Sequence, residues 1–198
     1  ASHLLALLDE PNHTLKAHAL KLLHHAVPNH WPEIADALPN IEALHEDDAF
    51  PQSNLAALVA AKTYYYLNEL PDALLFALGA GPAFDVDEPS EFVDAVLTHA
   101  IDEYCALHQK RAEAERAAAS SSGNATAAAA PEIDDRLVSL VNRLIESSLS
   151  QRAYLNVMGL ALESRRIDLA ERTIRLCGAA PGRTEHDSSV AAMLAHLP

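Results

Sequence analysis

The stretch that decides the fold is SEFVDAVLTHAIDEY, residues 90–104. Its apolar residues recur at spacings of three and four, the pattern of a helix with one buried face. They are Phe92, Val93, Val96, Leu97, Ala100, Ile101 and Tyr104. Ser90 precedes them at a position where a serine commonly caps a helix. The stretch therefore predicts an amphipathic α-helix that begins just after Ser90.

The rest of the chain also predicts helix. Only 6 of the 198 residues are glycine, no segment alternates apolar and polar residues, and the 11 prolines fall between apolar stretches. We therefore predict an all-α fold of about ten short helices. Pro28 is predicted to end the second of them. The expected ranges are 4–8, 14–26, 31–38, 41–44, 55–67, 71–78, 90–104 with a charged continuation, 133–149, 154–163 and 168–177, with one last short helix at 188–197.

Two segments, 66–73 and 162–169, share one organisation: a helix ends, the chain turns tightly, and a new helix begins near an aspartate. This is typical of antiparallel helical hairpins, the units of an α-solenoid, and predicts a solenoid-like rod. Residues 118–131 are a low-complexity Ala-Ser-Gly-Asn stretch, predicted to be a flexible insertion, although its alanines also suit a continued helix. Residues 178–198 form a looser tail, and we expect a single domain over 1–198.

Charge and cysteine content exclude several classes of function. The chain has 28 acidic and 14 basic residues and a formal net charge of −14, which disfavours nucleic acid and anionic membrane surfaces as partners. No apolar run approaches the roughly 20 residues that cross a bilayer. The two cysteines, Cys105 and Cys177, form no CxxC motif, so we expect a reducing compartment and no disulfide framework. The start of the sequence shows no secretory signal.

Read in order, several segments resemble one known family. They are LLALLDE (4–10), WPEIADALPNIEALHEDDAF (31–50), LAALVAAKTYYYLNELPDALLFALGAG (55–81), IDDRLVSLVNRLIESSL (133–149) and ALESRRIDLAERTI (161–174). Together with the stretch at 90–104, they resemble the N-terminal region of the family of 26S proteasome non-ATPase regulatory subunit 1. The resemblance extends from Leu4 to Ile174, is interrupted at 118–131, and is looser after Ile174.

The resemblance implies a rod of paired helices that serves as a non-catalytic scaffold of the proteasome regulatory particle. It further implies contacts with lid and ATPase subunits, a part in ubiquitin-dependent protein degradation, and a location in cytoplasm and nucleus. No cofactor and no small-molecule substrate are expected. Two alternatives stay open: the paralogous base scaffold that receives ubiquitin, and a TPR-like interaction adaptor outside the proteasome.

Neither metal-binding nor catalytic motifs support an enzyme. Histidines crowd the first 30 residues, but His18 and His25 are seven apart and His24 and His25 point in different directions, so no zinc site is expected. The acidic clusters at 46–48 and 85–88 lack the calcium-loop pattern and are predicted to be solvated capping loops. No GxSxG, GxGxxG or GxxxxGK[ST] motif occurs. Cys105 is expected to be a small buried side chain.

Four residues are candidates for protein interaction. Arg165 and Arg166 stand in the predicted turn before the helix at 168, where an arginine pair would clamp a partner's carboxylate. Pairing with the chain's own acidic residues is the alternative. Asp47 and Asp48 would form an acidic docking patch for a basic partner. In the run 64–66, two tyrosines are predicted to pack and the third to expose its hydroxyl; the alternative is an aromatic peptide groove.

Overall fold

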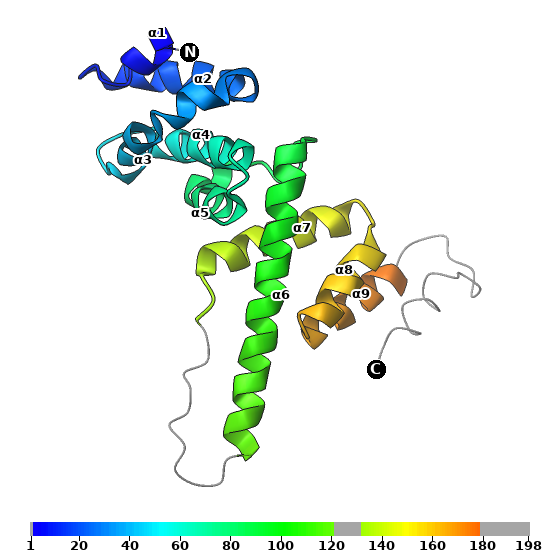
Figure 1. Cartoon of the computed structure of the whole chain (residues 1–198). Coiled ribbons are helices and arrows are strands. Elements are labelled where there is room, and N and C mark those ends of the chain that lie inside the picture. Colours follow the sequence, from blue (N-terminus) through cyan, green and yellow to red (C-terminus); the bar gives the residue numbers. More distant parts are fainter. Residues whose placement is uncertain (1, 121–131, 179–198) are drawn as a thin grey trace. The chain divides into compact units, whose positions relative to one another are not determined.

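The computed structural model describes residues 2–120 and 132–178, and among these all side chains except those of 117–120. This part of the chain is all-α and solenoid-like, as predicted, with no strand among the described residues (Figure 1). Its elements are α1 (Ser2–Ala6), α2 (His13–Ala35), α3 (Leu38–Glu46), α4 (Ser53–Tyr66), α5 (Leu70–Ala80), the 3₁₀ turn η1 (Gly81–Ala83), α6 (Glu91–Ser120), α7 (Asp135–Ser150), α8 (Tyr154–Glu163) and α9 (Ile167–Gly178).

The prediction that Pro28 ends the second helix is wrong. α2 continues through Pro28 and Pro32 to Ala35, and the predicted break appears as a kink at His30, whose φ is −132° and ψ 19°. A proline inside a helix removes one N–H donor and crowds the preceding turn. Val27 and Ile34, on either side of the kink, are both fully buried in the same core, and this burial offsets the cost of the prolines.

The N-terminal cap predicted for α6 is confirmed, and at the C-terminal end residues 118–120 follow the alternative of a continued helix instead of the predicted flexible insertion. Ser90 caps the helix, since its hydroxyl accepts a hydrogen bond from the N–H of Val93 at 3.2 Å. At the other end the helix continues to Ser120, so the first residues of the alanine-rich stretch extend it. The remainder of the predicted insertion, 121–131, and the tail from 179 with its expected helix at 188–197 lie outside the described residues.

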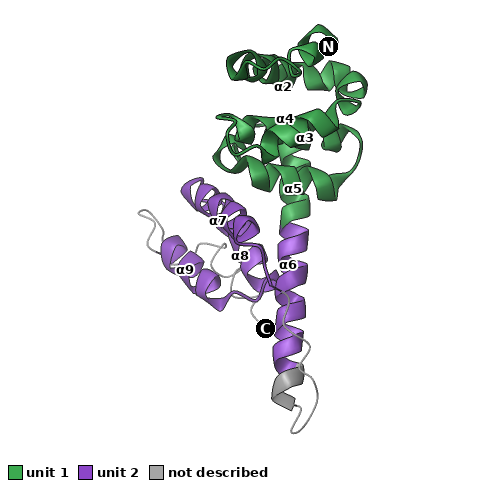
Figure 2. Ribbon diagram, turned by 90° about the vertical axis from the view of Figure 1, so that its left-hand side faces the viewer, with its two compact units in different colours: residues 1–100 green, residues 101–198 purple. Residues whose placement is uncertain are grey.

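The chain divides into two compact units, residues 1–100 and 101–198 (Figure 2). α6 takes part in both, with residues 91–100 in unit 1 and the rest in unit 2. The single domain expected over 1–198 therefore stays a prediction.

Unit 1 is built around α2 and α4. The inward face of α2 supplies Leu20, Leu23 and Val27, all fully buried, and α3 adds Ile41 to the same core. α4 is buried on most of its circumference, because it packs against α2, α3 and α5. A helix that is apolar nearly all round is suited to such a central place.

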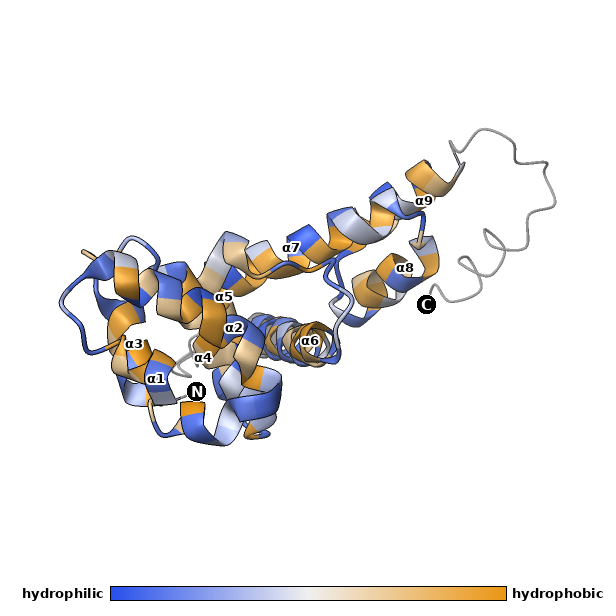
Figure 3. Cartoon of the chain, turned by 90° about the horizontal axis from the view of Figure 1, so that it is seen from above, coloured by the Kyte–Doolittle hydropathy of each residue, from blue (hydrophilic) through white to orange (hydrophobic). Residues whose placement is uncertain are grey.

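In unit 2, α7 and α9 both separate hydrophobic from hydrophilic residues strongly, and in α7 the two kinds lie on different sides of the helix (Figure 3). Its buried residues are Leu137, Leu140, Val141, Ile145 and Leu149. Asp134 caps its N-terminus by accepting a hydrogen bond from the N–H of Arg136 at 2.8 Å. α8 and α9 pack on each other as a hairpin.

Three hairpin turns have the same backbone. After α4, α7 and α8, one residue adopts a left-handed conformation: Asn68 (φ 63°), Arg152 (φ 62°) and Arg165 (φ 56°). The following N–H donates back to a carbonyl of the helix's last turn, as from Arg166 to Ala161 at 2.8 Å. This is the Schellman motif, which satisfies carbonyls that a helix end leaves unpaired. It confirms the hairpins predicted at 66–73 and 162–169 and adds a third.

We expect Arg152→Gly to raise the free energy of unfolding by about 0.5–1 kcal/mol. A left-handed backbone strains any residue with a Cβ, and the gain from glycine is reduced by its greater freedom in the unfolded chain. The exposed Arg152 side chain is removed equally in Arg152→Ala, which should give no gain. Urea denaturation of the three chains measures the effect. Equal stabilisation by alanine and glycine would contradict the backbone argument.

Candidate interaction surface

Arg166, in the turn between α8 and α9, joins three helices of unit 2. Its Nη1 donates to the hydroxyl of Tyr104 on α6 at 3.3 Å and to Oδ1 of Asn142 on α7 at 3.2 Å. Its Nη2 donates to Oδ2 of Asp168, at the start of α9, at 2.7 Å. The Arg166 side chain is 26% exposed. The guanidinium is therefore engaged by the chain's own residues, the alternative that the sequence left open.

The charges around Arg166 shift the pKa values of its neighbours. Its hydrogen bonds to Asp168 lower the pKa of that carboxyl and raise the pKa of the guanidinium itself. The ring of His108 lies 4.3 Å from that of Tyr104. Burial, followed by the positive charges of Arg166 and Arg111, lowers the pKa of His108. A neutral His108 beside a charged arginine is thus favoured at neutral pH.

Arg165 differs from Arg166 in its surroundings. It is the left-handed residue of the α8–α9 turn, with an exposed side chain, whereas Arg166 points inward to Tyr104 and Asn142. The sequence predicted that the two arginines act together as a clamp, but their side chains have different surroundings and different roles. Arg166 holds helices together, and Arg165 presents its charge to solvent.

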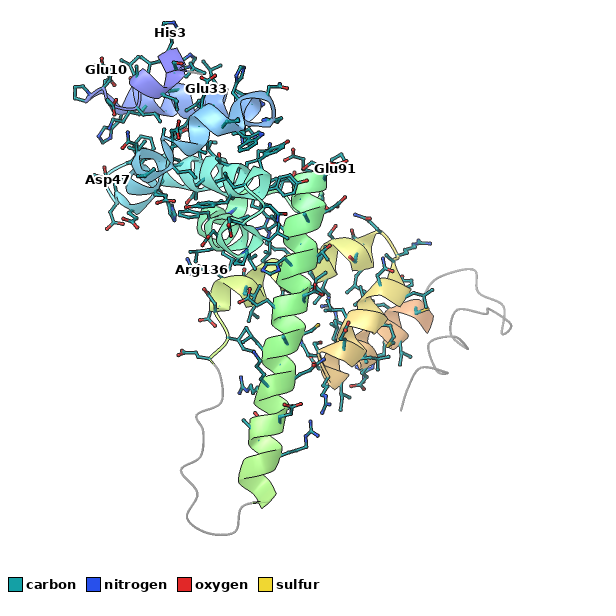
Figure 4. The ribbon with its side chains drawn as sticks, viewed as in Figure 1. His3, Glu10, Glu33, Asp47, Glu91 and Arg136 are labelled. Atoms are coloured by element: carbon teal, nitrogen blue, oxygen red, sulfur yellow. The ribbon has the colours of Figure 1, made fainter. Side chains whose placement is uncertain are left out.

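Asp47 and Asp48 lie in unit 1, exposed at the end of α3. Asp47 is labelled in Figure 4 at the edge of the unit. Its Oδ1 accepts a hydrogen bond from the N–H of Ala49 at 2.9 Å, and its carbonyl accepts one from the N–H of Phe50, whose side chain is buried. This is a capping loop, as predicted, with both carboxylates at the surface. Their role in docking stays a prediction, as does that of the arginines.

The tyrosine run packs more than the sequence predicted. Tyr64 stacks on Phe76, with ring centroids 5.4 Å apart and an interplanar angle of 10°. Its hydroxyl donates to the carboxylate of Glu42 at 2.5 Å, and burial and that carboxylate raise the pKa of Tyr64 to about 12. Tyr65 lies edge-on to Phe92 and Tyr66. The rings contact neighbouring aromatic residues, in agreement with the predicted packing rather than with the alternative of a peptide groove.

Among residues 2–120 and 132–178, no group of three or more histidine, cysteine, aspartate or glutamate side chains is arranged to hold a metal ion. In the same part of the chain, no helix is both long and apolar enough to span a bilayer. Both cysteines are buried thiols, and burial raises the pKa of the Cys105 thiol to about 11. A thiol with such a pKa is a poor nucleophile at neutral pH.

The most perturbed histidine is His24 on α2. Burial, with the charge of Lys62 on α4 and that of His25, lowers its pKa to about 4. Its Nε2 lies 3.5 Å from the Lys62 Nζ, and its Nδ1 is buried without a hydrogen-bond partner among the described residues. The ring is therefore neutral at pH 7 in the folded chain.

We expect the free energy of unfolding to fall as pH drops from about 6.5 to about 4. Over this range His24 becomes protonated in the unfolded chain but stays neutral in the folded chain, so protons favour the unfolded state. The pKa is lower in the folded state, so the loss begins near the unfolded value and ends near the folded one. Replacing His24 by glutamine should flatten this slope. Urea denaturation between pH 7 and 4.5 compares the two chains. An unchanged slope in the variant would show that His24 does not cause it.

Known proteins place the chain in a family. The model of the N-terminal domain of 26S proteasome subunit RPN2 matches residues 1–192. The chain belongs to the RPN2 N-terminal domain family. The match continues past Ile174, where the sequence resemblance seemed to loosen. Of the alternatives left open, family membership therefore favours the subunit 1 resemblance over the ubiquitin-receiving paralogue and the TPR-like adaptor.

Individual relatives of the RPN2 family agree. The chain is 43% identical over 176 residues to 26S proteasome non-ATPase regulatory subunit 1 homolog B of Arabidopsis thaliana, covering 88% of this chain and 16% of the relative. It is 39% identical over 168 residues to subunit 1 of Drosophila melanogaster, covering 85% and 15%. It is 35% identical over 175 residues to subunit RPN2 of Saccharomyces cerevisiae, covering 88% and 18%. The chain thus spans less than a fifth of each relative's length.

Proposed function

We propose that this chain is a non-catalytic scaffold region of the 26S proteasome regulatory particle. The observation that carries the proposal is its membership of the RPN2 N-terminal domain family over nearly its whole length. The relatives are named as regulatory, non-ATPase subunits. Stacked helical hairpins suit this role, because they fix the spacing of surface loops without a reaction centre.

The mechanism we propose is geometric. Helix-crossing contacts, such as the bidentate Arg172–Glu146 pair, join neighbouring helices of unit 2, here α9 and α7. Exposed charges at turns and helix ends, Asp47 and Asp48 in unit 1 and Arg165 in unit 2, would then meet lid and ATPase subunits. Action in ubiquitin-dependent degradation, in both cytoplasm and nucleus, belongs to the same proposal.

The test is quantitative purification of the particle. A tagged full-length subunit that contains this chain should co-purify lid and ATPase subunits in constant proportion, as measured by mass spectrometry. Recovery of the intact, folded subunit without them would contradict the proposal.

We expect the double variant Asp47→Asn, Asp48→Asn to reduce recovery of at least one lid or ATPase subunit by about threefold or more. Asparagine keeps the oxygen that Ala49 donates to, so the loop is preserved while two charges are lost. The matched control is Asp102→Asn, Glu103→Asn on α6, which removes two exposed carboxylates elsewhere. Equal recovery from the loop variant and the unmodified subunit would exclude the acidic loop as a docking site.

A further inference from the structure

Aspartate and glutamate are absent from most of α2, although the chain has 28 of them. From His13 to His30, α2 has two lysines and five histidines but neither aspartate nor glutamate. The helices that pack against it have none either: α1 carries His3, and α4 carries Lys62. Glu10 precedes this stretch, and Glu33, on the last turn of α2, follows it and lies 3.8 Å from His30; both glutamates are labelled in Figure 4. This part of α2 thus has no negative charge of its own, within a strongly negative chain.

The outer side of α2 also exposes leucine. Leu15 and Leu22, two turns apart, are 40% and 41% exposed, and they alternate with the exposed His18 and His25 at spacings of three, four and three. Lys21 is exposed beside them. At 100° per residue these five lie within about 120° of arc. We call Leu15, His18, Lys21, Leu22 and His25 the basic face of α2.

The spacing on the basic face is that of a coiled-coil seam, with leucine and histidine at the contact positions and lysine at the edge. The two leucines offer apolar contact, while lysine and the imidazole N–H groups offer donors to carboxylates. We propose that the basic face of α2 binds an acidic amphipathic helix of another protein, with apolar residues on Leu15 and Leu22 and carboxylates beside Lys21 and the histidines. The proposal rests on the proposed function in taking a regulatory-particle subunit as the source of that helix.

Charge decides among the occupants of this face. A second copy of the chain would set Lys21 against a like charge, which disfavours self-pairing. Nucleic acid would set its phosphates against two exposed leucines in the middle of the face, with a single lysine beside them. An acidic helix would complement the leucine pair with its apolar side and Lys21 with its carboxylates, and the rest of this acidic chain would repel it from other sites.

Site-specific photo-crosslinking in the assembled particle tests the proposal. A benzophenone amino acid replaces Leu22 in the tagged full-length subunit, and after irradiation the crosslinked segment is sequenced by mass spectrometry. We expect one segment with helical apolar periodicity and carboxylates three or four residues from the crosslink. The control carries the benzophenone at Leu75 on α5, also an exposed leucine of unit 1 (50%), where Asp72 stands one turn away.

Lys21→Glu should lower the crosslink yield at position 22 by about fivefold or more, whereas Lys110→Glu, the same charge reversal on α6, should leave it unchanged. Any one of four results would overturn the proposal. The crosslinked segment could come from the same subunit or lack carboxylates. The crosslink yield at position 22 could be no higher than at Leu75, or Lys21→Glu could leave it unchanged. Co-purification of lid and ATPase subunits is scored in the same samples. If those subunits are absent, the proposed function fails, while the sequence of the crosslinked segment still decides the binding chemistry of the basic face.

Discussion

Leu23→Ala is expected to lower the free energy of unfolding of unit 1 by about 3–4 kcal/mol. Leu23 is fully buried on the inner side of α2, in the core that α2 shares with α4. Removing three carbons there forfeits apolar burial and leaves a cavity that the surrounding helices cannot close fully. Urea denaturation followed by far-UV circular dichroism measures the loss.

The neighbouring residue is the natural control. Leu22 is 41% exposed, so Leu22→Ala should cost less than about 1 kcal/mol. Leu22 belongs to the exposed basic face of α2, whereas Leu23→Ala acts on the buried core. Comparable destabilisation by the two variants would mean that α2 is rotated from the orientation described.

Arg166→Ala has the second largest expected effect, a loss of about 2–3 kcal/mol from the free energy of unfolding of unit 2. The substitution removes donors to Tyr104, Asn142 and Asp168 on three helices. The tyrosine side chain is 1% exposed, so its hydroxyl would lose a partner that water cannot readily replace. Arg166→Lys, with one point charge instead of a fork, should recover part of the loss.

Arg165→Ala is the matched control and should change stability by less than about 0.5 kcal/mol, because its side chain is exposed. The pKa of Asp168 is lower in the folded chain than in the unfolded one, so its ion pair is complete above roughly pH 4 and is lost as pH falls further. The difference between wild type and Arg166→Ala should therefore shrink below that pH. Equal losses from the two arginine substitutions would contradict the contacts described.

The sequence predicted the helices well where apolar spacing and capping residues agree. The bounds predicted for α8 are those observed, and Ser90 caps α6 as expected. The prediction at Pro28 is wrong because it considered only the local cost of a proline inside a helix. The burial of Val27 and Ile34, which offsets that cost, depends on the whole core and is not visible in the local sequence. The turn at Arg152 was not singled out, since neither glycine nor asparagine marks its left-handed residue.

The candidate site was harder to predict because its chemistry depends on contacts far apart in sequence. Two partners of Arg166, Asn142 and Tyr104, lie 24 and 62 residues away in the sequence. Glu42, which accepts the hydrogen bond of the Tyr64 hydroxyl, lies 22 residues from that tyrosine. No periodicity encodes such pairs. The basic face of α2 could have been predicted from the absence of carboxylates from residues 13–30. The histidines of this stretch were considered only as metal ligands.

The measurement that tests the central claim most directly is the subunit content of particles built with and without this region. The full-length subunit and a variant lacking residues 1–178 are tagged identically, expressed in cells, and purified at low salt. The account predicts that lid and ATPase subunits recovered per tagged subunit fall at least about fivefold in the variant, a loss of about 1 kcal/mol of assembly free energy. Undiminished recovery with the variant would contradict a scaffold role for this chain.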